Sequence, residues 1–234
     1  MYKLPEEPRI SIVVPALNEE RLIEQTLKNA RDVAPEAEII VVDGGSKDDT
    51  VKIASKYAKA YVKNGNIAVL RNIGAEVAAG DIIIFLDADT MITRQFMEEV
   101  KKKFIDPRIV GAGGMIMPSQ ANILEEAVFY VFNFLIMASF MFWGPFLPGT
   151  CVAYKRKPFF EVAGFDAKMT ASEDFDICKR ISKNGKVVFL RNVSVRTSRR
   201  RLEKLGLMGV ILDWSQVTVQ YLRGKKTRSY RTFR

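Results

Sequence analysis

A run of five apolar residues that leads straight into two carboxylates constrains this chain more than any other feature. Residues 82–86 read Ile-Ile-Ile-Phe-Leu, and Asp87-Ala88-Asp89 follows directly. An unbroken apolar run of this length predicts a strand buried on both faces, as in a parallel sheet covered by helices. Asp87 and Asp89 lie two residues apart, so they project to the same side at the carboxyl end of that strand.

The carboxyl ends of strands are where open α/β sheets bind their ligands. Paired carboxylates such as Asp87 and Asp89 suit Mg²⁺ or Mn²⁺ that carries a substrate phosphate. The alternative is that both residues only form the turn after the strand, since Asp is a common turn residue.

The composition limits the chemistry that is available. The 234 residues carry a net charge of +9, which indicates an anionic partner such as a phosphate-bearing substrate, an acidic membrane surface or a nucleic acid. The chain has no histidine, so an acid–base catalyst must be a carboxylate, Lys, Tyr or Cys. Cys151 and Cys178 are far apart and form no CxxC pattern, and we expect both to be reduced core residues.

Strands and helices alternate along the first ninety or so residues. The apolar pattern predicts strands at residues 10–14, 38–42, 61–62 and 82–86. We expect Asn18 to cap the first helix, Ser46 and Asp49 to form a capping box at the second, and a third helix at 67–79. This alternation predicts βαβ units, but neither the G-x-G-x-x-G fingerprint nor the P-loop is present. Metal and basic side chains must therefore hold any phosphate.

Several segments together carry a family resemblance. They read Val-Val-Pro-Ala-Leu-Asn-Glu-Glu at 13–20, Val-Val-Asp-Gly-Gly-Ser-Lys-Asp-Asp-Thr at 41–50, Arg71-Asn72-x-Gly74 with Ala79-Gly80-Asp81, and Phe-Leu-Asp-Ala-Asp at 85–89. Farther on come Gly149-Thr150-Cys151, Gly164-Phe165-Asp166 and Ser172-Glu173-Asp174-Phe175-Asp176. In this order the segments resemble the family 2 glycosyltransferases of the GT-A fold over roughly residues 10–200.

The resemblance implies an α/β fold, with a Rossmann-like, mostly parallel sheet flanked by helices, and a site for a nucleotide sugar. The residues implied are Pro15, Ala16 and Glu19 for the nucleoside pocket, Asp43 for the base, Arg71 for the diphosphate, Asp87 for the ribose or metal, and Asp89 for the metal, which would be Mg²⁺ or Mn²⁺. For Arg71 the alternative is a solvated charge on a helix.

The family places its general base in the acidic pair that matches Glu173 and Asp174. Asp174 would take the proton of an acceptor hydroxyl as that oxygen attacks the anomeric carbon of the sugar. A lipid phosphate acceptor is already ionised, and Asp174 would then orient the acceptor or the sugar. A purely structural alternative also exists, in which Ser172 caps a helix and the acids favour its dipole.

Residues 197–201, Thr-Ser-Arg-Arg-Arg, form the most basic local cluster. Guanidinium groups bind diphosphate oxygens well and would stabilise charge on the leaving nucleotide. We therefore expect Arg199 and Arg200 to contact the nucleotide sugar. An exposed basic turn is the alternative.

Two apolar stretches suggest a membrane. Residues 127–143 are almost all apolar, and a single span there would separate the two halves of the site, so we expect a buried helix or one lying in the interface. Residues 205–222 have helical spacing and precede a basic tail, which predicts an amphipathic helix on an anionic membrane surface. A helix packed on the domain with a solvated tail is the alternative.

These features predict a catalytic GT-A domain at 1–204, with a nucleotide-sugar half at about 1–115 and an acceptor half at 116–204, followed by the helix and tail at 205–234. The N-terminus lacks the apolar region of a signal peptide, so we expect a cytoplasmic protein attached peripherally to the cytoplasmic face of a membrane.

The resemblance implies an inverting, metal-dependent transfer from a GDP- or UDP-sugar to a lipid-linked or polyprenyl-phosphate acceptor, with no nucleic acid partner. One alternative is a non-catalytic basic module that binds membranes or nucleic acid, which leaves the acid-bearing strand ends unexplained. Another is a sugar-phosphate nucleotidylyltransferase. That class would have a Gly-rich, basic loop after the first strand, where this chain has Pro-Ala-Leu-Asn-Glu-Glu.

Overall fold

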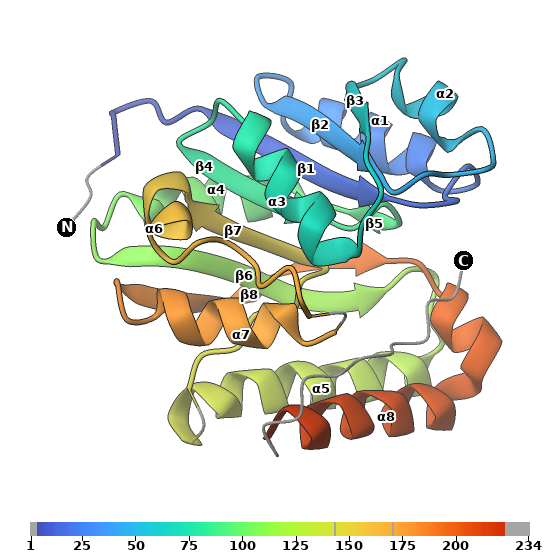
Figure 1. Ribbon diagram of the computed structural model, residues 1–234. Helices are drawn as coiled ribbons and strands as arrows, with labels where there is room; N and C mark the ends of the chain where they lie inside the picture. The colour runs from blue at the N-terminus through green and yellow to red at the C-terminus, as the bar shows by residue number, and fades with distance from the viewer. Residues whose placement is uncertain (1–3, 143, 170, 223–234) are drawn as a thin grey trace.

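One curled sheet with helices on both faces organises the molecule (Figure 1). The computed structural model describes residues 4–142, 144–169 and 171–222. Within them the sheet has eight strands in the order β3-β2-β1-β4-β7-β6-β8-β5. The pairs β2–β3, β1–β2, β1–β4 and β6–β8 are parallel, whereas β7 runs antiparallel between β4 and β6, and β5 runs antiparallel to β8. The predicted mostly parallel α/β sheet is confirmed.

The N-terminal half consists of the predicted βαβ units. Its elements are β1 Ile10–Ala16, α1 Ile23–Val33, β2 Glu38–Asp43, α2 Thr50–Ala54, β3 Lys59–Val62, α3 Ile67–Val77, β4 Ile82–Leu86, β5 Thr90–Met91 and α4 Arg94–Phe104. Strand β1 continues through Pro15 to Ala16, two residues farther than predicted, and remains parallel to β2 at Pro15.

The second half adds the antiparallel strand and the helices that close the site. Its elements are β6 Ile109–Pro118, α5 Ile123–Phe142, β7 Cys151–Lys155, α6 Arg156–Glu161, α7 Glu173–Ile181, β8 Lys186–Thr197 and α8 Arg200–Leu222. In Figure 1, α5 and α8 lie side by side as a layer at the bottom of the molecule, farther from β1 than α7 is.

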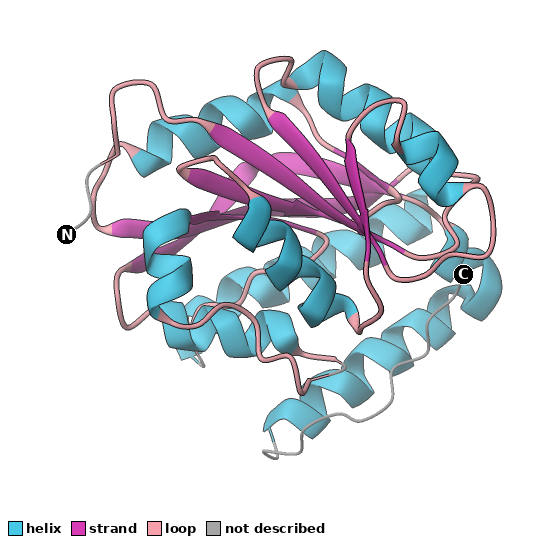
Figure 2. Ribbon diagram, turned by 45° about the horizontal axis from the view of Figure 1, so that its top comes forward, coloured by secondary structure: helices cyan, strands magenta, loops and turns pink. Residues whose placement is uncertain are grey.

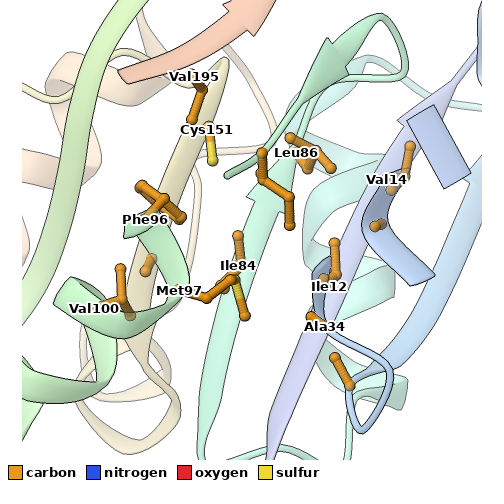
Figure 3. Packing of buried hydrophobic residues seen from close by; sticks show 14 of the residues in the cluster. Ile12, Val14, Ala34, Ile84, Leu86, Phe96, Met97, Val100, Cys151 and Val195 are labelled. Atoms are coloured by element: carbon orange, nitrogen blue, oxygen red, sulfur yellow. The ribbon is translucent and has the colours of Figure 1, made fainter. Parts of the chain in front are cut away.

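Alternate residues of the central strands face two separate cores, as the period of two in a strand requires. Ile12 and Ile84 belong to the core on the side of α1 and α4 (Figure 3). Val13 and Phe85 belong to the core on the other side, under α3, α6 and α7. Figure 2 shows the strands as a twisted layer between these helices. The apolar run of β4 is thus buried on both faces, as predicted, and both cysteines are buried and free.

Two predicted helix caps are wrong. Asn18 has a left-handed backbone conformation with φ of 53°, and its Oδ1 accepts a hydrogen bond from Lys47 N at 2.9 Å. Ser46 donates its hydroxyl to Asp43 and accepts a hydrogen bond from Asn18 N at 2.7 Å. Helices α1 and α2 begin later, at Ile23 and Thr50. The polar side chains after β1 and β2 therefore tie the two loops to each other.

One stripe of α5 faces the protein. Its buried residues are Glu125, Phe129, Asn133 and Ile136. Asn133 accepts a hydrogen bond from Ile116 N at 3.0 Å and donates one to Ile116 O at 2.8 Å, which fixes α5 on β6. In the described residues α5 is the one helix that is long and apolar enough to cross a membrane by length and composition.

Helix α8 starts inside the predicted catalytic domain. It begins at Arg200 and is interrupted at Gly206, where φ is 66°, before it continues to Leu222. The predicted boundary at residue 204 falls within it. The helix does not bury all of its apolar residues on one side, as an amphipathic helix packed on the domain would. Val210 is buried, but the apolar Met208 and Leu212 are exposed. The basic tail that was predicted after Leu222 lies outside the described residues.

Candidate active site

A pocket of about 650 Å³ lies at the carboxyl ends of β1 and β4, as the open-sheet rule predicts. This volume is typical of small-molecule sites. The predicted residues that line it are Pro15, Ala16, Glu19, Arg71, Asp87, Asp89, Glu173, Asp174 and Arg200. A second hollow, of about 740 Å³ near Arg9 and Asp81, is lined by none of the predicted site residues.

Asp87 and Asp89 come to the pocket on a short connection between β4 and β5. Asp87 N donates to Thr150 O at 2.9 Å, which ties this connection to the start of β7. Asp89 lies against β8, where Ser198 N donates to its carbonyl at 3.0 Å and the Ser198 hydroxyl donates to Oδ2 at 2.6 Å. Burial raises the pKa of Asp87 to about 6; the nearby Arg71 guanidinium opposes the rise and the Asp89 carboxylate adds to it.

Arg71 is an internal residue, and the alternative of a solvated helix charge is wrong. Its side chain is only 2% exposed and links three parts of the chain. It donates to Glu173 at 2.7 Å, to Asp87 at 2.9 Å and to Gly149 O at 2.8 Å. A Cβ at Gly149 would lie 2.8 Å from both terminal guanidinium nitrogens, so a side chain there would displace Arg71 from these contacts. Arg71 therefore connects the two predicted acidic segments from beneath the pocket.

Asp174 is a carboxylate held in place by the main chain. Its Oδ2 accepts from Gly149 N at 3.0 Å and its Oδ1 accepts from Phe175 N at 2.9 Å. Burial and the neighbouring Glu173 carboxylate raise the pKa of Asp174 to about 7, against the effect of these hydrogen bonds. A carboxylate that titrates near neutral pH in a pocket is suited to proton transfer.

Ser172 does not cap α7. It has a left-handed backbone conformation with φ of 63°, and no side-chain hydrogen bond caps the helix. Its hydroxyl is buried without a hydrogen-bond partner among the described residues. The purely structural alternative for this segment thus loses its Ser172 cap. What remains of it is the favourable interaction of the acidic side chains in the first turn with the helix dipole.

Arg200 closes the pocket from the other end of the sequence. Its guanidinium donates to both oxygens of Glu19, at 2.6 and 2.8 Å, and to Asp89 Oδ2 at 3.2 Å. Arg199 differs from its prediction, because it does not line the pocket and instead donates to Glu125 on α5 at 2.7 Å. Arg199 precedes the first residue of α8, whereas Arg200 and Arg201 in its first turn line the pocket.

Asp43 is also not among the residues that line the pocket. The side chain is fully buried, accepts from Gly45 N at 2.9 Å and Ser46 N at 2.7 Å, and also accepts from the Ser46 hydroxyl. The structure therefore shows Asp43 holding its own loop through these hydrogen bonds. The contact with a base stays a prediction.

Comparison with known proteins agrees with this geometry. A sequence model described as glycosyl transferase family 2 matches residues 11–162, which include all of β1 except Ile10, and also Asp43, Arg71, Asp87 and Asp89. The chain belongs to glycosyltransferase family 2. This membership favours the glycosyltransferase reading of the sequence over the binding module and the nucleotidylyltransferase.

Relatives in this family include enzymes named for lipid-phosphate substrates. The undecaprenyl-phosphate 4-deoxy-4-formamido-L-arabinose transferase of Proteus mirabilis is 35% identical over 95 residues, which cover 35% of this chain and 29% of that protein. The dolichyl-phosphate beta-glucosyltransferase of Homo sapiens is 28% identical over 158 residues, which cover 55% of this chain and 49% of that protein. The chain thus spans less than half the length of each of these two relatives.

Solved structures share the GT-A fold. A mannosyltransferase from Pyrobaculum calidifontis, in complex with GDP-Man and Mn²⁺, matches with a TM-score of 0.74 and 21% identity over 95% of this chain and 66% of that chain. Glucosyl-3-phosphoglycerate synthase from Mycobacterium tuberculosis, with Mn²⁺, UDP-glucose and phosphoglyceric acid, matches with a TM-score of 0.62 and 20% identity over 94% of this chain and 82% of that chain. At these identities the likeness is one of fold.

The residues present fit the divalent metal that binds in those structures. Five carboxylates line the pocket against three guanidinium groups, so the acidic side chains outnumber the basic ones there. In the described part of the chain no three His, Cys, Asp or Glu side chains form a metal cluster. Such a metal would be held by one or two carboxylates and completed by substrate phosphates, which is a common arrangement for Mg²⁺.

Sequence reasoning missed the apolar wall of the pocket. Phe146 and Phe175 stack there with ring centroids 3.6 Å apart, and Trp214 of α8 stacks on Phe132 of α5 at 4.0 Å. The aromatic residues were visible in the sequence, but only the tertiary fold brings α5 and α8 to the site. The contact between Ser198 and Asp89 was also not predicted, although Ser198 lies within the basic segment at residues 197–201.

Proposed function

We propose that this protein is an inverting, metal-dependent glycosyltransferase that moves a sugar from a GDP- or UDP-sugar to a lipid-linked acceptor. The observation that carries the proposal is that two carboxylates line one pocket. Asp89 follows β4, and Asp174, whose pKa is raised to about 7, lies at the start of α7. Asp89 would hold the metal that binds the leaving diphosphate, and Asp174 would deprotonate or orient the acceptor.

The donor would bind over the ends of β1 and β4. Pro15 and Ala16 form an apolar part of the pocket lining against which a nucleoside can pack. Leu17 and Leu70 also line the pocket. Asp89 and Asp87 would hold Mg²⁺ or Mn²⁺, which neutralises the diphosphate when it is bound. Each carboxylate already accepts a hydrogen bond from a guanidinium group, Asp87 from Arg71 and Asp89 from Arg200.

Arg200 would act on the leaving group. It lies beside Asp89, and its interaction with Glu19 holds the planar guanidinium in one orientation. A fixed guanidinium matches the geometry of diphosphate oxygens and stabilises the negative charge that builds on them. The nucleoside diphosphate then departs with the electron pair of the broken bond to the anomeric carbon.

Asp174 would act on the acceptor. In a direct displacement the acceptor oxygen forms its bond to the anomeric carbon while the bond from that carbon to the diphosphate breaks, and the configuration inverts. If the acceptor is a hydroxyl, Asp174 takes its proton, for which a pKa of about 7 is well placed. If the acceptor is a lipid phosphate, no proton has to move and Asp174 orients the attacking group.

The lipid-linked acceptor is supported by the lining of the pocket and by the relatives. Phe129, Phe132, Val210 and Trp214 give the pocket an apolar wall from α5 and α8. Two of the relatives are named for transfer to undecaprenyl and dolichyl phosphates. We keep the expectation of a cytoplasmic protein attached peripherally to the cytoplasmic face of a membrane as part of this proposal.

The test is a transfer assay with purified protein, Mn²⁺, labelled UDP- and GDP-sugars, and polyprenyl phosphate in detergent. We expect label to move into the lipid fraction with one donor, and a product of inverted anomeric configuration. EDTA should abolish the transfer. The outcome that contradicts the proposal is the absence of transfer and of donor hydrolysis with every sugar nucleotide, from protein that is shown to be folded.

A further inference from the structure

The outer face of α5 is unusual for a helix packed on a soluble domain. Large apolar side chains are exposed along its whole length, among them Ile123, Leu124, Val131, Phe134, Leu135 and Met141. Phe134 is 60% exposed and Met141 is 81% exposed. Contiguous apolar surface of this extent marks a site of interaction with a protein or a membrane.

The exposed face cannot turn inward, because α5 is fixed on its other side. Asn133 forms two hydrogen bonds with the backbone of Ile116 on β6. At the start of the helix Glu125 accepts from Arg199 at 2.7 Å. These contacts keep the helix flat along the domain and leave its outer residues pointing away from it.

Helix α8 extends the same surface. It lies next to α5 in Figure 1, and Trp214 contacts the rings of Phe129 and Phe132 on α5. Met208 and Leu212 of α8 are exposed, at 68% and 63%. The two helices thus present one apolar surface on the outside of the molecule, and their inner residues form the apolar wall of the pocket.

The charge of the surrounding sequence identifies the partner. After Glu126 the rest of α5 carries no charged residue, so nothing on it opposes insertion into an apolar phase. Residues 223–234, which follow α8, contain six Lys or Arg and no Asp or Glu. An apolar helical layer joined to a basic segment matches a bilayer leaflet with anionic headgroups.

We propose that the outer faces of α5 and α8 form a membrane-docking surface that inserts into one leaflet of an anionic bilayer without spanning it. The proposal rests on the proposed function for its purpose. Because the same two helices supply the apolar wall of the pocket, docking holds the site next to lipid-linked acceptors. The docking itself can be measured without any activity.

The experiment is flotation of the purified protein with vesicles of phosphatidylcholine and phosphatidylglycerol, and with phosphatidylcholine alone. We expect binding to the anionic vesicles, weakened but not abolished by high salt, since salt screens the charge but not the apolar contact. Phe134→Glu and Met141→Glu should each weaken binding by about tenfold, because each places a charge where an apolar side chain would be buried in the bilayer. Ile105→Glu, at a 75% exposed position after α4, is the matched control and should bind as wild type does.

Other results overturn the proposal. Vesicle binding that is absent in wild type, or equal in Phe134→Glu and wild type, excludes α5 as the docking surface. A stable dimer in light scattering that Phe134→Glu converts to a monomer assigns the surface to a second copy of the chain. Calorimetric binding of the same nucleotide, UDP or GDP, by wild type and every variant, measured in parallel with Mn²⁺, shows that the pocket is folded. It keeps failure of docking distinct from failure of the proposed transferase.

Discussion

Arg200 and Glu19 are 181 positions apart in the sequence and form a two-bond ion pair, with nitrogen–oxygen distances of 2.6 and 2.8 Å. This pair joins the start of α8 to the loop after β1, and the same guanidinium reaches Asp89 at 3.2 Å. The C-terminal helix is therefore part of the candidate donor site rather than an appendage of the domain.

The first prediction concerns this arginine. Arg200→Lys keeps the charge but loses the planar fork, so we expect kcat/KM to fall by about a hundredfold. Arg199→Lys is the matched control on the neighbouring residue, which binds Glu125 outside the pocket. Steady-state kinetics of both variants with the same donor measure the effect. Equal losses in the two variants would show that Arg200 has no special role.

The second prediction concerns pH. With a hydroxyl acceptor Asp174 must be ionised, so kcat/KM should rise about tenfold per pH unit below its pKa of about 7 and level off above it. Glu173→Gln removes a negative neighbour, which should lower the pKa of Asp174 and move the inflection to lower pH. A rate that is independent of pH between about 5 and 8, or an inflection that moves upward in Glu173→Gln, would rule out this role for Asp174.

The third prediction concerns stability. Arg71→Met leaves the Asp87 and Glu173 carboxylates without their buried partner, which should lower the free energy of unfolding by about 3–5 kcal/mol at neutral pH. The folded pKa of Asp87 is already raised, so its protonated form is favoured in the folded state, and loss of Arg71 raises that pKa further. The deficit should therefore be largest at high pH and shrink as the pH falls toward about 5.

Urea denaturation at several pH values tests the stability prediction. Arg108→Met is the control, because Arg108 also contacts a carboxylate with two nitrogens, that of Asp106, but is more than half exposed. Its loss should cost about 0–1 kcal/mol. A deficit in Arg71→Met as small as in the control would show that the internal network adds nothing to stability.

The sequence predicted what depends on short-range pattern. The apolar run of β4 and the position of Asp87 and Asp89 at its end follow from periodicity and from the rule for open sheets, and the structure confirms the strand and brings both acids to the pocket. The segment Arg71-Asn72-x-Gly74, quoted for the family resemblance, also has a packing role. Gly74 packs so closely on β1 that a Cβ would lie 2.2 Å from a Val13 methyl carbon.

The errors came from contacts that only the tertiary fold creates. Asn18 and Ser46 have the chemistry of helix caps, but the loops after β1 and β2 meet and use these side chains on each other. Arg199 and Arg200 cannot be told apart by composition, since the direction of α8 decides which one meets Glu19. For residues 127–143 the sequence left two alternatives open, a buried helix or one lying in the interface, because an apolar helix has the same pattern in both cases.

The most direct test of the account is a calorimetric titration of UDP and GDP, with and without Mn²⁺, into wild type, Asp89→Asn and Asp32→Asn. Asp89→Asn keeps the shape of the side chain and its bond from Ser198 but removes the charge, whereas Asp32 is an exposed aspartate on α1. We predict that one nucleotide binds only with Mn²⁺ and that Asp89→Asn weakens it by about a hundredfold, near 3 kcal/mol, while Asp32→Asn has no effect. Failure of both nucleotides to bind wild type, or equal binding by Asp89→Asn, would contradict the assignment of this pocket as a metal-dependent sugar-nucleotide site.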